Sequence, residues 1–116
     1  MTVLERPPVS ARVCDILCRL GVRAETTGFY FAAYAVDLVC VQPQRVTLVT
    51  KWLYPDVARA YKTSVFAVER GIRLAVSRAW KGQAEQFQEL FPDGDRPTSS
   101  RFISKVAMYL IGEGVA

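Results

Sequence analysis

The stretch LYPDVARAYKTSVFAVERGIRLAVSRAW, residues 53–80, decides the fold of this chain. Its pattern predicts a short helix, a polar turn at Lys62, Thr63 and Ser64, and a longer helix that ends near Trp80. Two helices joined by such a turn form a helix-turn-helix, whose second helix enters the DNA major groove. The stretch therefore predicts both a local fold and a class of ligand.

The longer helix, residues 64–80, has two chemically different sides. Apolar residues at spacings of three, four and seven predict a buried side made of Val65, Val68, Ile72, Ala75, Val76 and Ala79. The other side carries Phe66, Glu69, Arg70, Arg73 and Ser77. Arginine can donate to O6 and N7 of guanine, and glutamate can accept from N4 of cytosine. The alternative is a plain surface helix with an intrahelical Glu69–Arg73 pair, which spacing alone does not exclude.

The shorter helix and the turn fit the same motif. Pro55 suits a first helical turn, where its missing N–H costs nothing. The predicted buried side of this helix comprises Val57, Ala58 and Tyr61. Either Thr63 or Ser64 accepts from the free amides that open the longer helix. We expect phosphate contacts from Lys62, Thr63 and Ser64, since the positive end of a helix attracts anions.

Positive charge is concentrated in this part of the chain. The whole sequence has a net charge of +4. Residues 51–81 hold seven Lys or Arg against two Asp or Glu, whereas residues 82–116 hold three against five. This distribution favours a nucleic-acid ligand, although a solvated basic face on an ordinary helix pair would give the same count.

Composition limits the class of protein. The 116 residues suffice for one domain, and 51% apolar with 22% charged residues is typical of a globular chain. The longest apolar run, residues 29–41, contains Asp37 and is too short to span a membrane. The leader MTVLERPPVSAR lacks the apolar core of a signal peptide, and three cysteines suit a reducing cytoplasm. We expect a cytoplasmic protein without a membrane partner.

Prolines, glycines and capping residues divide the remaining chain. Residues 1–9 are expected to be a flexible leader, residues 10–112 a single helical DNA-binding domain, and residues 113–116 a frayed tail. Gly21 is expected to end the first helix and Gly82 the long one. The segment 45–53 is taken as a short helix despite its β-branched content. The other expected helices are 10–20, 29–41 with Thr26 or Thr27 as cap, 84–91, and one that begins at Thr98 or Ser99.

Three segments resemble a known family. They are TKWLYPDVARAYKTSVFAVERGIRLAVSRAW at 50–80, GVRAETTGFYFAAYAV at 21–36 and RPTSSRFISKVA at 96–107. They are similar to the C-terminal effector domain of the master sporulation response regulator, stage zero sporulation protein A. The likeness covers roughly residues 10–110.

The resemblance implies an all-α, compact bundle of about six helices containing a helix-turn-helix, of the winged-helix-like DNA-binding class. It implies that Glu69 and Arg73 face bases and that Arg70 faces phosphate. It further implies head-to-tail binding on repeated boxes of double-stranded DNA, and a location at the bacterial nucleoid. A contact with an RNA polymerase sigma factor would involve Gln83, Glu85, Gln86 and Glu89.

The chain departs from that family at several positions. Family members commonly carry polar or basic groups where this chain has Phe66, Ala67 and Leu74, so DNA binding could be weaker or prefer another box. Arg101 stands where a capping glutamate is expected. The receiver domain that normally precedes the effector is absent from this sequence. The chain is then either an excised domain or a stand-alone relative, and we do not expect phosphorylation to be its switch.

Other chemistry is sparse. Cys14 and Cys18 lie one helical turn apart, but without histidine and with only Cys40 besides, we expect buried, inert thiols and no metal site. No Gly-rich phosphate loop, serine elbow or carboxylate cluster appears, so we expect neither an enzyme nor a cofactor. The large aromatic residues expected in helix packing are Trp52, Tyr54 and Trp80.

Two functions fit these observations. The first is a sequence-specific DNA-binding transcription regulator with helix 64–80 in the major groove. The second is a protein-interaction module of the same fold, which modulates a full-length relative or a sigma factor without strong DNA binding. Apolar Phe66 and Leu74 near the reading face favour the second.

Overall fold

The computed structural model describes residues 7–44 and 49–112, and these form helices and connecting turns without a strand. The predicted all-α bundle is confirmed. Residues 1–6 of the predicted leader, 45–48 of the predicted short helix and the 113–116 tail lie outside the described residues. The elements in order are α1 (Ala11–Arg19), α2 (Thr27–Val41), η3 (Val49–Leu53), α3 (Tyr54–Ala60), α4 (Val65–Gly82), α5 (Glu85–Leu90) and α6 (Ser99–Gly112).

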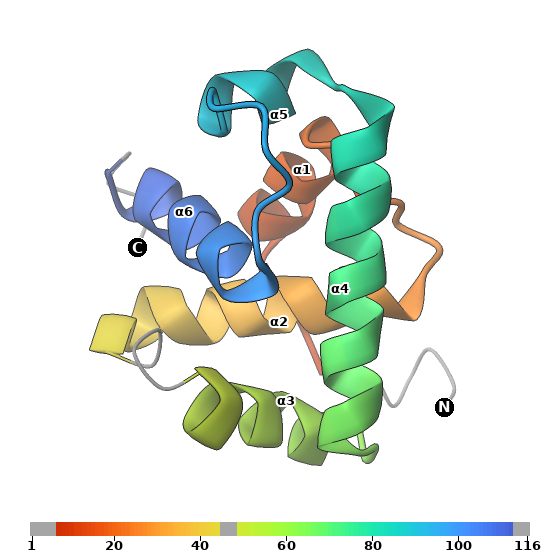
Figure 1. Ribbon diagram of the computed structural model, residues 1–116. Coiled ribbons are helices and arrows are strands. Elements are labelled where there is room, and N and C mark those ends of the chain that lie inside the picture. Colours follow the sequence, from red (N-terminus) through yellow and green to blue (C-terminus); the bar gives the residue numbers. More distant parts are fainter. Residues whose placement is uncertain (1–6, 45–48, 113–116) are drawn as a thin grey trace.

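Helix α2 is the centre of the bundle. It contacts α1, α3, α4 and α6, and Figure 1 shows it running across the middle of the molecule with α3 on one side and α6 on the other. Its buried residues cover slightly more than half of the helix circumference at 100° per residue: Gly28, Phe29, Phe31, Ala32, Ala33, Ala35, Val36 and Val39. Helices α1, α4 and α6 therefore all pack against the apolar helix α2.

Short polar side chains begin four of the helices. Ser10 accepts from the N–H of Arg12, Thr26 from Phe29, Ser64 from Ala67 and Thr98 from Arg101. Each such bond satisfies an amide that has no partner within its helix. These contacts select Thr26, Ser64 and Thr98 between the pairs of caps that the sequence left open.

The end of α1 follows the predicted glycine stop. Gly21 has φ of +93°, and the N–H of Val22 donates to the carbonyl of Leu17 at 3.0 Å. Both apolar partners, Leu17 and Val22, are buried. This is the hydrogen-bonding and packing pattern of a left-handed helix stop.

Two expectations about helix geometry are wrong in detail. Helix α4 continues through Gly82, and Gln83 takes the left-handed conformation with φ of +58°. The Gln83 side-chain amide donates to the carbonyl of Trp80 at 3.0 Å, which satisfies a helix-end acceptor. Of the predicted 45–53 helix, the described part is the π-helical turn η3.

Two expectations about burial are also wrong. The side chain of Trp52 is 51% exposed, because the wider winding of η3 does not follow α-helical spacing. Cys18 is exposed on the outer side of α1, whereas Cys14 and Cys40 are half-buried. Burial raises the pKa of the Cys14 and Cys40 thiols, which keeps them protonated and unreactive at neutral pH.

The C-terminal half is held together by aromatic contacts. The rings of Phe87, Phe91 and Phe102 pack together, with the Phe91 and Phe102 centroids 5.7 Å apart. Trp80 donates its indole N–H to the carbonyl of Gly94 at 3.0 Å, which attaches the 92–98 loop to α4. Arg101 lies over the Phe91 ring. The short α5 is thereby fixed at one end of α4.

Candidate nucleic-acid interface

Helices α3 and α4 are joined by a tightly hydrogen-bonded turn. Thr63 donates its N–H to the carbonyl of Ala58 at 2.9 Å, and Lys62 has φ of +53°. Such a left-handed residue ends the helix and turns the chain away from the helix axis. Ser64 then caps α4 by accepting from the N–H of Ala67 at 3.0 Å. The predicted helix-turn-helix is confirmed in its local geometry.

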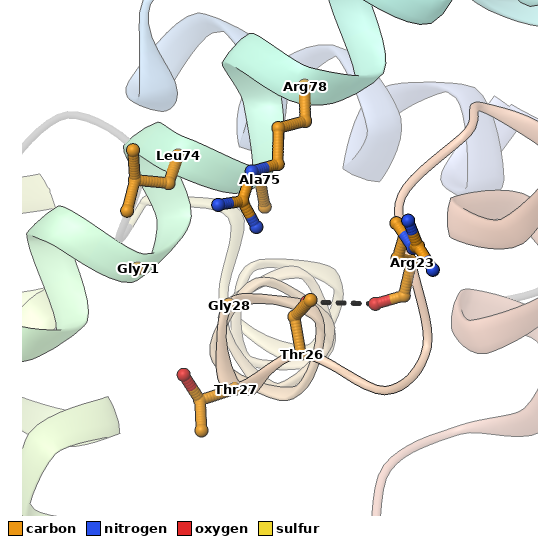
Figure 2. A pocket seen from close by; sticks show the side chains of 8 residues that line it. All are labelled: Arg23, Thr26, Thr27, Gly28, Gly71, Leu74, Ala75 and Arg78. Atoms are coloured by element: carbon orange, nitrogen blue, oxygen red, sulfur yellow. Dashed lines mark hydrogen bonds between the residues drawn. The ribbon is translucent and has the colours of Figure 1, made fainter.

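The buried side of α4 holds the helix firmly to the bundle. Val68, Ile72 and Val76 are at most 2% exposed, and Ala75 and Ala79 are also buried. Val65 is only half-buried. Shape adds to apolar burial, because α4 crosses α2 where Gly28 faces Gly71 (Figure 2). A Cβ on Gly28 would overlap the Gly71 carbonyl, so two glycines permit this close crossing.

The opposite side of α4 is open to solvent. Glu69, Arg70 and Arg73 are exposed, whereas Ser77 is half-buried. Arg73 and Glu69 form an intrahelical pair at 3.6 Å, with about half of each side chain exposed. Such a surface pair contributes only a few tenths of a kcal/mol, so a base edge can replace it at little cost. Arg70 makes no salt bridge with any described residue.

The turn before α4 is equally accessible. Lys62, Thr63 and Ser64 are all exposed. The Ser64 oxygen accepts the capping hydrogen bond, but its O–H can still donate outward. Three polar side chains therefore surround the positive end of an 18-residue helix.

The structure adds two arginines that the sequence analysis did not select. Arg23 and Arg78 line a shallow pocket between the start of α2 and the side of α4, and Figure 2 shows the Arg78 side chain extending over the first residues of α2. Arg23 pairs with Glu25, while Arg78 has no ionic partner within the described ranges. The long-range crossing of α2 and α4 brings both arginines to the same pocket. No sequence pattern predicted that crossing.

The residues expected to contact polymerase lie at the far end of α4. Gln83, Glu85 and Glu89 are exposed and Gln86 is half-buried. Figure 1 shows α5 beside the C-terminal end of α4, whereas α3 lies beside its N-terminal end. The α5 residues are thus separated from the turn at Lys62, Thr63 and Ser64 by the length of α4, and from Arg73 by about half of that length.

Within the described residues no cluster of three or more His, Cys, Asp or Glu could hold a metal ion. In the same part of the chain, no helix has the length and apolar character needed to cross a membrane.

Comparison with protein families agrees with this architecture. A family model described as "Sporulation initiation factor Spo0A C terminal" matches residues 13–110, which is most of the chain. The match spans α2, α3, α4 and α5 in full and nearly all of α1 and α6. The family comprises DNA-binding effector domains of a sporulation response regulator and is not an enzyme family. The chain therefore belongs to the family of Spo0A C-terminal domains.

Proposed function

We propose that this chain regulates transcription by binding double-stranded DNA sequence-specifically, with α4 in the major groove. Glu69 and Arg73 contact base edges in this proposal. Phosphate contacts come from Arg70, Lys62, Thr63 and Ser64. Binding is head-to-tail on tandem boxes, and the α5 surface with Gln83, Glu85, Gln86 and Glu89 contacts a sigma factor.

The observation that carries the proposal is the exposed side of α4. Glu69, Arg70 and Arg73 are exposed on a helix whose other side is fixed in the core. A rigid helix that presents a fork-shaped donor and a carboxylate meets the geometric requirement for reading guanine and cytosine. The capped turn adds donors at the position where a phosphate would lie.

The test is a titration of the chain against a family box and a scrambled duplex at two salt concentrations. We expect Arg73→Ala to lose about 1–3 kcal/mol of discrimination at one base position. Lys62→Ala should weaken binding to both duplexes and reduce the salt slope by about 1. Lys105→Ala is the matched control, since Lys105 is an exposed lysine on α6.

Equal, weak binding to both duplexes would contradict the proposal. The assembly part of it is tested separately by the solution mass of the chain with and without a tandem-site duplex. A complex that holds only one chain on a duplex with two boxes would contradict head-to-tail binding. It would leave sequence-specific recognition in place.

A second function is favoured by one observation. Phe66 is 74% exposed and Leu74 is 40% exposed, and both lie on α4. In this alternative, a full-length relative or a sigma factor binds the chain and covers these two side chains. In that case both duplexes bind weakly and equally, and the chain co-elutes with the protein partner in the absence of DNA.

A further inference from the structure

The most exposed aromatic ring in the described part of the chain lies in the first turn of α4. The Phe66 side chain is 74% exposed, compared with 51% for Trp52 and 38% for Tyr109. Phe66 is the second residue of α4 and follows the Ser64 cap by two positions. It does not belong to the core, and its ring packs in none of the described aromatic pairs. The ring is therefore free to make a contact with a molecule outside the chain.

Helical geometry places Phe66 among the proposed base-reading residues. With 3.6 residues per turn, Phe66 is rotated by about 60° from Glu69, about 40° from Arg70 and about 20° from Arg73. In helix-turn-helix proteins the N-terminal residues of the recognition helix contact base edges. If α4 occupies the major groove as proposed, Phe66 lies in the groove as well.

The surroundings of the ring favour DNA over a protein surface. Its neighbours on the exposed side are charged, and the nearest other exposed apolar side chain on α4 is Leu74. Leu74 lies about 12 Å further along the axis and about 80° around it, on the flank that faces α2. The two therefore do not form the continuous apolar patch that the core of a protein interface requires. A single aromatic ring surrounded by charged side chains is instead complementary to the DNA major groove, where an apolar group lies between polar base edges.

The major groove offers one such apolar group. The 5-methyl of thymine projects into it, and side chains such as phenylalanine contact this methyl directly. The phenylalanine ring has no donor for the O4 acceptor of thymine, so Phe66 would recognise thymine through the methyl group alone. We propose that Phe66 is a specificity-determining residue that contacts a thymine 5-methyl next to the bases read by Glu69 and Arg73. This inference rests on the proposed DNA-binding function.

The experiment removes only the methyl group. The wild-type chain first selects its preferred duplex from a random pool, and each thymine of that duplex is then replaced in turn by deoxyuridine. We expect one thymine at which the replacement weakens wild-type binding about threefold to fivefold, as for the loss of one buried methyl. The ratio should hold at two salt concentrations while the affinities themselves fall, because an apolar contact releases no counterions.

Variants link the effect to the ring. In Phe66→Ala the thymine and deoxyuridine duplexes should bind equally, and Phe66→Leu should retain part of the preference. Met108→Ala is the matched control, since Met108 is 54% exposed on α6 and should leave the ratio unchanged. Circular dichroism of each variant confirms that the fold is retained.

The outcomes separate this inference from the function on which it rests. A duplex that is selected but shows no thymine dependence, or the same dependence in Phe66→Ala, would overturn the role of Phe66 and leave DNA recognition intact. If the pool yields no preferred duplex at all, the DNA-binding function itself fails, and the role of Phe66 fails with it.

Discussion

Lys62, at the junction of α3 and α4, has a left-handed backbone conformation and carries a positive charge that we propose contacts phosphate. Its φ of +53° lies in the left-handed region, which costs a non-glycine residue about 1–2 kcal/mol. Glycine adopts this conformation without that cost but loses more chain entropy on folding. Lysine at this position is understandable if its ammonium group serves a ligand.

Replacing Lys62 by two different residues separates these two properties. We expect Lys62→Gly to raise the free energy of unfolding by up to about 1 kcal/mol, because the strain of the turn is relieved. Lys62→Ala keeps a Cβ at the same φ and should not stabilise the chain. Both variants lose the same charge, so DNA affinity should fall equally in both. Urea denaturation and a DNA titration measure the two effects, and a glycine variant less stable than the alanine variant would contradict the account.

At the level of the elements, the crossing of α2 and α4 depends on backbone contact. A Cβ on Gly28 would meet the Gly71 carbonyl, which can move only if α4 itself moves. We expect Gly28→Ala to lower the free energy of unfolding by about 2–3 kcal/mol, the usual cost of overpacking a rigid site. Gly71→Ala should cost less, since its Cβ would lie 3.0 Å from the Phe31 ring, which can adjust.

Gly82→Ala is the control for this prediction. Gly82 is the last residue of α4 and has open space where a Cβ would lie. Alanine there should be neutral or stabilise the chain by up to about 1 kcal/mol through helix propensity. The midpoint of thermal or urea unfolding ranks the three variants, and equal midpoints for Gly28→Ala and Gly82→Ala would contradict the close crossing.

The elements also show what the sequence could and could not predict. Caps and apolar spacing act within a few residues, so the Ser10 cap, a cap of α4 at Thr63 or Ser64, and the buried side of α4 apart from Val65 were predictable. Burial of the predicted stripe in turn leaves Glu69 and Arg73 exposed, so the candidate site was largely predictable too. Trp52 and the Arg23–Arg78 pocket depend on local winding and on a long-range crossing, which no short pattern encodes. The contact between Gly28 and Gly71 was not predictable either, because nothing in a single sequence indicates that two glycines so far apart will meet.

For the molecule as a whole, α4 acts as a spacer between two candidate surfaces. Its 18 residues span roughly 27 Å at 1.5 Å per residue. The turn at Lys62 lies at one end and the acidic α5 surface with Glu85 and Glu89 at the other (Figure 1). The Debye length at physiological salt is about 8 Å, so charges at one end barely affect phosphate binding at the other.

This separation predicts that the two activities can be removed independently. Reversing both charges in Glu85→Lys/Glu89→Lys should leave DNA affinity within about twofold at 0.15 M salt, since the added charges lie about three Debye lengths from the turn and more than one from Arg73. The same variant should abolish stimulation of transcription by polymerase that carries a sigma factor. Arg73→Ala should instead weaken binding to the preferred duplex, and it should lose stimulation of transcription because it no longer binds that DNA. DNA titration and transcription in a purified system measure both, and a large loss of DNA affinity in the α5 variant would show that the two surfaces are one.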